Sequence, residues 1–391
     1  MKQEDTIKII HRLLEQIDLN ASELSSEEKI VSTSAFTDST IFEKEKTLFF
    51  YQQPQVIGFS AEVAKPNSFY TTESMGKPLL VTRDEIGKLR AFINACPHRG
   101  AKVAEGTGML GQNGQQKRLV CPFHGWAFNL NGKLNGRPGS QFFTSEGEQC
   151  QLTQLPVTDK YGLLVVGLDS SIQQQDVDDY LDSIGYEIED FKLNELHSHP
   201  SHEVNVKANW KLVAHMSHES YHFSNLHKDS VAQYLHSNAV YDTFGKHSRW
   251  AFAMRGLEQL KNEPKSKWPR FLDGAMNHTL FPGTVLVSNP EDAQLIRVEP
   301  GEKPGESKVY FSGVYRDLNN KEGADFAYDF GFTVFSQEDL PVAEQCQKGF
   351  AAGQKTMIIG KNEPIVAFWQ TLWEQQLAEM EAHTNKQLLS L

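Results

Sequence analysis

The chain has 391 residues, enough for about two or three domains that each bury a hydrophobic core. Its composition is typical of a soluble globular protein, with 39% hydrophobic and 23% charged residues. The net charge of −12 argues against nucleic acid and anionic membranes as partners, because both require basic patches. Solubility accounts for this acidity, although an acidic face could also dock a basic redox partner.

The cysteines and the N-terminus indicate the compartment. Four cysteines occur, and if Cys96 and Cys121 bind a metal, Cys150 and Cys346 are expected to be buried free thiols. The first residues lack the basic and then apolar layout of a signal peptide. The longest apolar run, residues 163–168, has the length of a strand and not of a membrane span. We therefore expect a cytoplasmic protein.

The N-terminal region is predicted to be helical. Residues 6–18 carry apolar side chains at helical spacing. A second, short helix is expected to begin at Thr40, where Thr40 and Glu43 have the spacing of a capping box. Both helices are expected to pack against a larger body.

The pattern becomes that of a β domain between residues 55 and 168. Residues 78–82 and 89–93 predict a hairpin, and Asn131-Gly132 is a strong turn signal. Residues 163–166 predict the last strand of this region. Together they predict a small antiparallel β domain.

Two similar segments lie on loops of this β domain. They are Cys96-Pro97-His98-Arg99-Gly100 and Cys121-Pro122-Phe123-His124-Gly125-Trp126. Two thiolates and two imidazoles fit either a tetrahedral zinc ion or a Rieske [2Fe–2S] cluster. A structural zinc knuckle usually has Cys-x2-Cys or His-x3–5-His on at least one side, and neither is present. The flanking prolines and glycines, which fold the backbone closely around the metal, favour the cluster.

A GxGxxG segment occurs at residues 106–111. A dinucleotide-binding fingerprint must follow a strand and open a helix, whereas this segment is followed by a Gln-rich turn at 112–116. We interpret it as a loop. Because no other nucleotide motif is present in the sequence, the electrons for a redox reaction are expected to come from another protein.

The C-terminal half alternates helices and strands. Helices are predicted at 176–184, 209–223 and 365–380, and strands at 201–208, 247–254, 284–288, 294–298 and 308–315. The apolar face of the last helix is interpreted as core.

The densest cluster of ionisable side chains runs from His215 to His227. On a continuous helix, one face would carry His215, His218, Glu219 and His222. His227 would lie about 140° from His222, so the helix must end between them if both bind one metal. Two histidines and one carboxylate leave open positions on Fe(II), an arrangement that suits O₂ activation.

The third ligand must come from elsewhere in the chain. Asp339 is the first candidate, with Glu338, Asp329 and Glu344 as alternatives, and capping of a helix by Ser336 and Asp339 is a competing interpretation. Glu219 is placed to accept the second ring N–H of His222. His215 and His218 are expected to support the site or to lie in the core.

With both clusters in view, the chain resembles the Rieske non-haem iron oxygenases, the terminal-oxygenase α subunits of the ring-hydroxylating family. Residues 96–100, 121–126 and 209–227 carry the resemblance. It implies an α+β fold with an antiparallel β-sandwich Rieske domain at 51–168 and a helix-grip catalytic domain at 169–391. That second domain has a curved antiparallel sheet, and residues 1–50 would form helices packed on it.

The resemblance also assigns residues. Cys96, His98, Cys121 and His124 would bind the [2Fe–2S] cluster, and His222, His227 and Asp339 would bind mononuclear Fe(II). Glu219 falls where the family has an acidic bridge between the neighbouring subunit's His124 and His222. The chain departs from the family in having Glu219 where many members have aspartate, a long segment at 99–120, and His215 and His218 before the bridge.

The expected function is that of a terminal oxygenase that activates O₂ and hydroxylates a small organic substrate. A reductase that uses NAD(P)H, sometimes with a ferredoxin, would supply electrons to a homotrimer. An aromatic ring is the first expected substrate, and mono-oxygenation or N-demethylation of a small quaternary or alkyl amine is the alternative. An electron-transfer or zinc-binding protein without oxygenase activity is a more distant alternative. The substrate pocket is expected to draw on Trp250, Phe252, Met254, Phe281, Phe311 and Tyr315.

Overall fold

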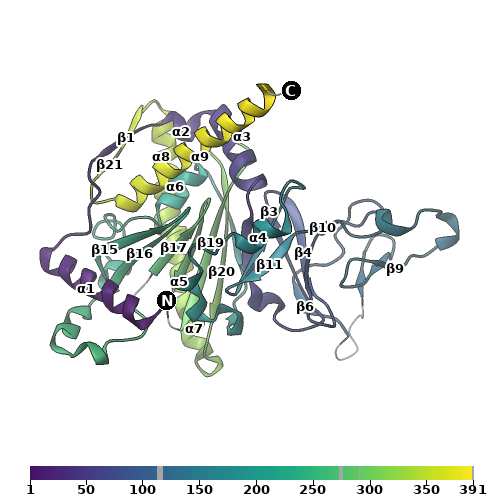
Figure 1. The fold of residues 1–391 in the computed structure, drawn as a ribbon, viewed down its shortest axis with the longest axis horizontal. Coiled ribbons are helices and arrows are strands. Elements are labelled where there is room, and N and C mark those ends of the chain that lie inside the picture. Colours follow the sequence, from purple (N-terminus) through teal and green to yellow (C-terminus); the bar gives the residue numbers. More distant parts are fainter. Residues whose placement is uncertain (112–117, 273–275, 290, 390–391) are drawn as a thin grey trace. The chain divides into compact units, whose positions relative to one another are not determined.

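The computed structural model describes residues 1–111, 118–272, 276–289 and 291–389 (Figure 1). The chain divides into two compact units. The larger unit comprises residues 1–50, 182–191 and 199–391, and the smaller unit comprises residues 51–181 and 192–198. Residues 169–181 thus lie with the smaller unit and not with the C-terminal domain expected from the sequence. The reason is helix α4 (Gln174–Asp179), which contacts strand β11 (Val157–Lys160) through the Gln174 side chain, whose Nε2 donates to the Val157 carbonyl over 3.0 Å.

The smaller unit is built from short antiparallel strands. One sheet has the order β10-β5-β4-β3-β6, a second has β11-β12-β2, and a third has β7-β8-β9. Besides β11, the strands of these sheets are β2 (Gln55–Phe59), β3 (Ser68–Ser74), β4 (Lys77–Arg83), β5 (Leu89–Ile93), β6 (Thr107–Met109), β7 (Leu119–Val120), β8 (Ala127–Phe128), β9 (Leu134–Gly136), β10 (Gln154–Leu155) and β12 (Leu163–Val166). The pairing of β4 with β5, with Leu79 opposite Ile93, confirms the predicted hairpin.

The Asn131-Gly132 turn fits closely against the core of the smaller unit. Gly132 has a φ of 80°, a conformation that glycine adopts without strain, and a Cβ atom there would overlap the ring of Phe92. The Gly132 N–H donates to the Asn129 carbonyl over 2.9 Å. The turn predicted from the sequence is therefore confirmed.

The GxGxxG segment differs from the predicted loop. Thr107–Met109 forms strand β6, which pairs antiparallel with β3, so that Gly108 lies opposite Phe69. Gly108 leaves room for the Phe69 ring, which a Cβ atom would meet at 2.8 Å. Gly108 thus serves sheet packing. The Gln-rich turn expected at 112–116 lies outside the described residues.

An antiparallel sheet forms the centre of the larger unit. Its order is β14-β20-β19-β18-β17-β16-β15. The strands are β14 (His202–Val206), β15 (Leu235–Phe244), β16 (His247–Met254), β17 (Met276–Leu280), β18 (Thr284–Ser288), β19 (Asp292–Pro300) and β20 (Ser307–Tyr315). The predicted strands at 201–208, 247–254, 284–288, 294–298 and 308–315 are confirmed. Strands β15 and β17 were not predicted.

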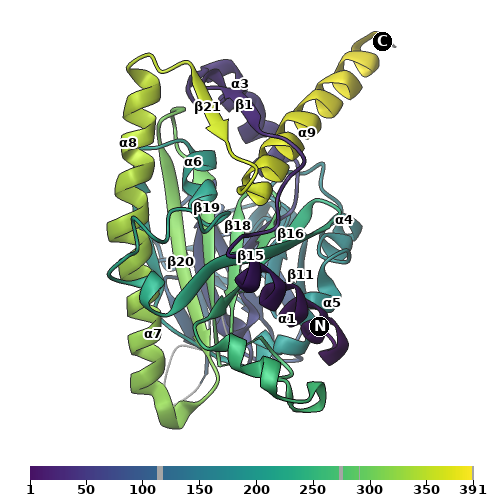
Figure 2. The ribbon, with the colours of Figure 1, turned by 90° about the vertical axis from the view of Figure 1, so that its left-hand side faces the viewer.

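Helices pack around this sheet. They are α1 (Gln3–Leu19), α2 (Ser34–Thr37), α3 (Ser39–Glu45), α5 (Gly185–Ile188), α6 (Trp210–His215), α7 (Lys321–Val334), α8 (Leu340–Ala351) and α9 (Pro364–Leu389), and a small sheet pairs β1 (Lys29–Ser32) with β21 (Thr356–Ile359). A π-helical turn, η11 (Phe335–Asp339), joins α7 to α8. Figure 2 shows α7 and α8 as one long helix along the side of the sheet.

The structure differs from two of the predicted helices and agrees with a third. Helix α3 begins near the predicted point, but Asp38 caps it by accepting from the Thr40 and Ile41 N–H groups, so the Thr40–Glu43 capping box is wrong. Helix α4 ends at Asp179, before the predicted residue 184. In α9 the side chains of Trp369 and Trp373 are buried, which confirms the interpretation of its apolar face as core.

The described part of the chain contains no helix that combines the length and the apolar character needed to cross a membrane. Cys150 is buried and Cys346 is half-buried, and both are free thiols.

Candidate functional site

The two Cys–His loops of the smaller unit are built in the same way. Cys96 N–H donates to the Ala101 carbonyl over 2.8 Å, and Cys121 N–H donates to the Trp126 carbonyl over 2.9 Å. Within each loop a glycine N–H, that of Gly100 or Gly125, donates back to the cysteine carbonyl. Both glycines have positive φ, 79° and 70°, which closes the turn. Each loop therefore folds back on itself around its cysteine.

The thiols and the imidazoles of these loops differ in exposure. Cys96 and Cys121 are buried against the hydrophobic core, whereas His98 is half-buried and His124 is exposed. The two imidazole rings lie 4.6 Å apart between centroids. Burial raises the pKa of the Cys96 thiol, and the neighbouring Cys121 thiol adds to the increase, while backbone N–H groups of His98 and Arg99 oppose it.

The four side chains are of the types that bind a Rieske [2Fe–2S] cluster, in which two thiolates hold one iron and two imidazoles hold the other. In the structure the two thiols are buried and the two imidazoles lie nearer the surface. This difference in exposure suits a cluster with an inner and an outer iron.

Aromatic side chains fix the plane of the His98 imidazole. The Trp126 ring stacks on it at 5.1 Å with an interplanar angle of 3°, and the Phe143 ring meets both rings edge-on. The Arg137 guanidinium lies over the Trp126 and Phe143 rings, at 5.1 and 4.6 Å from their centroids. This packing favours one orientation of the His98 imidazole.

A second group of ligand atoms lies in the larger unit. His222 Nε2 is 3.1 Å from His227 Nε2, and Asp339 Oδ1 is 3.2 Å from His227 Nε2 and 3.6 Å from His222 Nε2. Two ligands at right angles, each about 2.1 Å from a first-row metal, would be about 3 Å apart. The three atoms therefore fit around one ion.

The chain reaches this geometry by ending a helix early. The predicted helix 209–223 is wrong beyond His215, because Met216, Ser217 and His218 donate their N–H groups three residues back and the chain then continues as turns. A turn in which Leu226 N–H donates to the His222 carbonyl over 2.8 Å brings His222 and His227 together. The sequence predicts that the helix must end between His222 and His227 if both bind one metal. In the structure the helix ends earlier, at His215, and turns follow it as far as His227.

Each histidine of this group also has a carboxylate on its other nitrogen. The His222 Nδ1 forms a short hydrogen bond with Glu219, whose other oxygen accepts from the His222 backbone N–H over 3.1 Å. The His227 Nδ1 lies 2.7 Å from Glu338 Oε2. Both rings therefore turn Nε2 towards the point that they share with Asp339.

Asp339 lies in η11 and is 5% exposed. Burial raises its pKa, although His227 and His222 oppose this. Burial alone would lower the pKa of His227, but the neighbouring carboxylates of Asp339 and Glu338 raise it. Asp339 Oδ1 is buried without a hydrogen-bond partner among the described residues, which is the environment of an atom that binds a cation.

The alternatives to Asp339 have other contacts. Glu338 faces the Nδ1 nitrogen of His227, and Glu344 accepts from the Lys207 N–H over 2.9 Å. Asp329 is exposed on α7. The side chain of Asp339 makes no capping hydrogen bond, so the capping interpretation is wrong.

An aromatic wall lies beside the two histidines. We define it as Phe223, Trp250 and Phe252, all of which are buried. The Phe223 ring is 5.2 Å from the His222 ring and 5.6 Å from the His227 ring, and it contacts Trp250 at 6.1 Å and Phe252 at 5.6 Å. Trp250 and Phe252 were among the pocket residues expected from the sequence, but Phe223 was not. The one feature of the sequence that pointed to Phe223 is its position next to His222.

The other expected pocket residues have contacts elsewhere. Phe281 packs on Phe49 at 5.2 Å, and Tyr315 packs on His199 at 4.7 Å. Met254 is 38% exposed at the end of β16. Phe311 packs on Phe335, the first residue of η11, at 6.3 Å.

His215 and His218 belong to the core. Their rings stack on Trp373 at 5.3 Å and on Trp369 at 5.4 Å. Burial lowers the pKa of His215 to about 3 and lowers that of His218 well below its ordinary value. Both are therefore neutral at pH 7.

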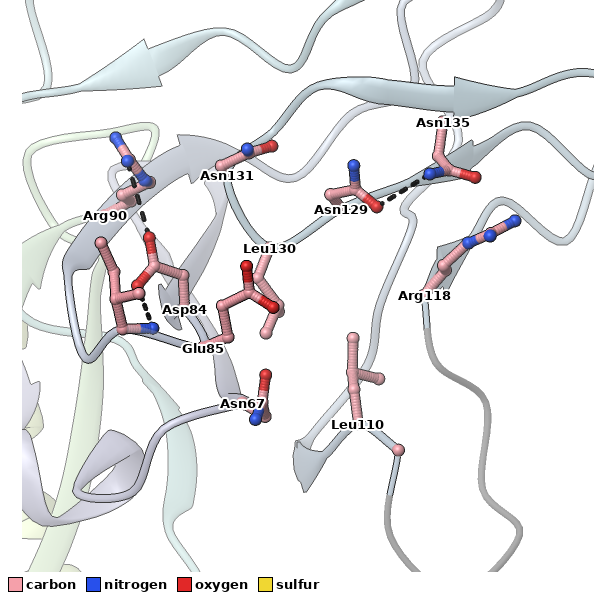
Figure 3. A pocket seen from close by; sticks show the side chains of 12 residues that line it. Asn67, Asp84, Glu85, Arg90, Leu110, Arg118, Asn129, Leu130, Asn131 and Asn135 are labelled. Atoms are coloured by element: carbon pink, nitrogen blue, oxygen red, sulfur yellow. Dashed lines mark hydrogen bonds and ion pairs between the residues drawn. The ribbon is translucent and has the colours of Figure 1, made fainter.

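A cavity of about 630 Å³ lies in the smaller unit. Figure 3 shows its polar lining, in which Asp84 pairs with Arg90 at 3.6 Å and Asn129 with Asn135 at 3.1 Å. None of the cluster-ligand candidates lines it. The cavity is thus separate from the two groups of ligands.

Two protein-family models match the chain. The model described as "Rieske [2Fe-2S] domain" matches residues 53–146, and the model described as "Ring hydroxylating alpha subunit (catalytic domain)" matches residues 193–379. Each match contains one of the two groups of ligand-type side chains.

Characterised relatives are similar over much of the chain. The carnitine monooxygenase oxygenase subunit of Escherichia coli (strain K12) is 26% identical over 326 residues, covering 80% of this chain and 82% of that protein. The chloroplastic choline monooxygenase of Beta vulgaris is 28% identical over 247 residues, covering 61% and 52%. The glycine betaine monooxygenase oxygenase subunit of Pseudomonas aeruginosa (strain UCBPP-PA14) is 25% identical over 210 residues, covering 53% and 47%.

Solved structures share the fold. The quaternary ammonium Rieske monooxygenase CntA in complex with L-carnitine superposes with a TM-score of 0.72 at 21% identity, covering 88% of this chain and 94% of that chain. Naphthalene 1,2-dioxygenase from Rhodococcus sp. bound to indole superposes with a TM-score of 0.70 at 17% identity, covering 95% and 98%. Because a ring dioxygenase and an amine mono-oxygenase match almost equally well, the fold does not distinguish between their substrates.

Proposed function

We propose that this chain, which belongs to the Rieske non-haem iron oxygenases, is the oxygenase component of an enzyme that mono-oxygenates a small quaternary or alkyl amine. The family uses a [2Fe–2S] cluster, mononuclear iron and O₂. The sequence placed an aromatic ring first among the expected substrates and an amine second. We now favour an amine as the substrate, while an aromatic ring as the substrate stays an untested prediction.

The observation that carries the proposal is the aromatic wall of Phe223, Trp250 and Phe252 beside the histidines. The faces of aromatic rings attract a quaternary ammonium group, with a free energy of about 2 kcal/mol when the contact is desolvated. All three rings are buried, as this requires. The relatives named for carnitine, glycine betaine and choline support the same substrate class, because each of these molecules carries a trimethylammonium group.

The ligand assignments form part of the proposal. Cys96, His98, Cys121 and His124 would hold the cluster, and His222, His227 and Asp339 would hold the iron. When bound, the two centres supply electrons and activate O₂. Glu219 accepts the Nδ1 proton of His222 and so keeps Nε2 directed at the metal position.

Residues of the larger unit would prepare the substrate for reaction. The buried aromatic wall excludes water from one side of the histidine pair and orients the methyl groups of the bound cation. Trp250 and Phe252 lie next to each other, with ring centroids 4.7 Å apart and planes tilted by 48°. We infer that the bound cation lies against this pair of rings.

Electron supply requires partners. Oxygenases of this family receive electrons from NAD(P)H through a reductase, in some cases with a ferredoxin. We further propose a homotrimer in which the exposed His124 of one subunit approaches Glu219 of the next, so that electrons pass through Glu219 to His222. Sedimentation of the cluster-loaded protein tests the trimer, and a monomer at micromolar concentration would contradict it.

The experiment that tests the substrate class uses matched pairs of compounds. The protein, loaded with cluster and iron, is supplied with NADH and a surrogate reductase, and O₂ uptake is measured with choline, glycine betaine and carnitine. Each is paired with its carbon analogue, in which an uncharged tert-butyl group replaces trimethylammonium. We expect kcat/KM to be about 30-fold higher for the trimethylammonium compound of each pair, from the cation–π free energy. Equal values within the pairs, or substrate-dependent uptake with naphthalene and not with amines, would overturn the proposal.

A further inference from the structure

We propose that Glu338 is a positioning residue that holds the His227 imidazole for the metal, as Glu219 holds the His222 imidazole. The inference rests on the ligand set proposed above. It gives the iron site two carboxylate–imidazole pairs, one on each histidine, where the sequence indicated only the pair formed by Glu219.

The contacts of Glu338 fix its carboxylate in place. Its Oε2 atom lies 2.7 Å from His227 Nδ1 and accepts a hydrogen bond of 2.9 Å from the Ser230 hydroxyl. The Ser230 backbone N–H in turn donates to the His227 carbonyl over 3.0 Å. The histidine, the serine and the glutamate thus form a closed unit in which the carboxylate cannot turn away without losing two hydrogen bonds.

These contacts set the tautomer of His227. A carboxylate is an acceptor, so the proton of the neutral imidazole lies on Nδ1 and points at Glu338. The Nε2 lone pair is then directed towards Asp339 Oδ1 at 3.2 Å and His222 Nε2 at 3.1 Å. A carboxylate on the remote nitrogen also makes the imidazole a stronger ligand.

The local backbone explains how two consecutive acids reach one ring. In a regular α-helix neighbouring side chains point about 100° apart, so Glu338 and Asp339 would not face the same partner. Both residues lie in the π-helical turn η11, which is wider than an α-helical turn. Glu338 meets Nδ1 and Asp339 meets Nε2 of the same imidazole, so the ring is held from both sides.

Two other roles for Glu338 give different measurable results. It could be a ligand in place of Asp339, although it faces the nitrogen that points away from the shared position. It could also be a solvated surface carboxylate, because its side chain is 30% exposed while that of His227 is 3% exposed. Binding of the metal itself separates the three roles.

The test measures Co(II) affinity of the full-length, cluster-loaded protein by competition with a chelator, together with the visible spectrum of bound Co(II). The variants are Glu338→Leu, which removes the acceptor, and Glu338→Gln, which keeps an acceptor oxygen without the charge. Asp329→Asn is the control, since it removes an exposed acid from the same long helix. We expect Glu338→Leu to weaken Co(II) binding by about 10–100-fold and Glu338→Gln to recover most of this loss. The control should bind as the wild type does.

Several outcomes would overturn the inference. Wild-type affinity in Glu338→Leu would make Glu338 a solvated carboxylate, and complete loss of the Co(II) spectrum at saturating metal would make it a ligand. If Glu338→Leu does not fold, as judged by its circular dichroism spectrum, Ser230→Ala takes its place, because it removes the hydroxyl that fixes the carboxylate. An affinity equal to wild type in Ser230→Ala would then count against the role. No substrate is present in these assays, so a failure of the amine proposal would leave the affinity series intact.

Discussion

Asp339 Oδ1 lies 3.2 Å from His227 Nε2, and this buried oxygen has no hydrogen-bond partner among the described residues. With the imidazole proton on Nδ1, the two facing atoms both carry lone pairs. Such a pair is stable in a buried site when a cation lies between its members. A metal ion at this point, as we propose, would be bound by both atoms.

Replacing Asp339 by alanine should remove the mononuclear iron and leave the cluster. We expect Asp339→Ala to lose about one iron per chain in elemental analysis and to keep the visible absorbance of the cluster. Cys121→Ser is the reciprocal control, because it should lose that absorbance while it still binds Co(II). Retained turnover in Asp339→Ala would place the third ligand elsewhere.

Replacing Glu219 by glutamine should separate metal binding from electron transfer. The amide in Glu219→Gln carries no negative charge, so the link to His222 Nδ1 weakens while all proposed metal ligands remain. We expect both metals to bind and the yield of oxidised product in a single turnover to fall by about 10–100-fold. The control is Glu322→Gln, which removes an exposed acid at the start of α7. Single-turnover product at the wild-type level would remove Glu219 from the electron path.

The aromatic wall predicts a charge-dependent effect on KM. Trp250→Leu keeps an apolar side chain but removes a ring face, so it should raise KM for a trimethylammonium substrate by about 2–30-fold, from a loss of about 0.5–2 kcal/mol. The KM of the neutral tert-butyl analogue should change by less, because it gains no cation–π attraction. Phe281→Leu is the control, since Phe281 packs on Phe49 and Trp369. Equal effects on the cation and the neutral analogue would show that Trp250 acts through packing alone.

The buried His215 predicts a loss of stability in acid. Its pKa is about 3 in the folded chain, because of burial, and about 6.5 when unfolded. Between these values the unfolded chain binds a proton that the folded chain does not, so the free energy of unfolding falls as the pH is lowered below 6.5. From pH 6.5 to 5 this one residue should cost about 2 kcal/mol.

His215→Phe should remove that component of the pH dependence. Phenylalanine can occupy the position that stacks on Trp373 but cannot bind a proton. Urea unfolding of the variant at pH 7 and pH 5 should therefore show a smaller decrease than the wild type. The same decrease in both proteins would mean that His215 is already accessible to protons in the folded chain.

Features set by neighbouring residues could be predicted from the sequence. Three such features are the two Cys–His loops, the hairpin of β4 and β5, and the turn at Gly132. Each of them depends on contacts within a short stretch of the chain. The pairing of His222 with Glu219 is also local, because three residues separate them even after the helix has ended.

Features that depend on distant contacts could not be predicted in the same way. Helical periodicity continued past His215, whereas in the structure the helix ends there. His222 and His227 then meet Asp339, which lies far along the chain. Strand β17 was missed because it buries polar side chains such as Asn277 and His278, which do not alternate with apolar ones. The pattern of β16 indicated which side chains are apolar, but not which of them face the histidines.

The π-helical turn makes the site sensitive to the phase between two helices. Leu340, Ala343 and Gln347 keep α8 anchored in the core, while Tyr328 and Val334 anchor α7. Between these anchors, η11 accommodates the offset that directs both acids at one imidazole. Deletion of a single residue such as Ser336 would remove the wide turn and so change where Glu338 and Asp339 point relative to the two anchored helices. Point substitutions at positions of this stretch that contact neither histidine, such as Ser336 and Gln337, should therefore be tolerated far better than a change in its length.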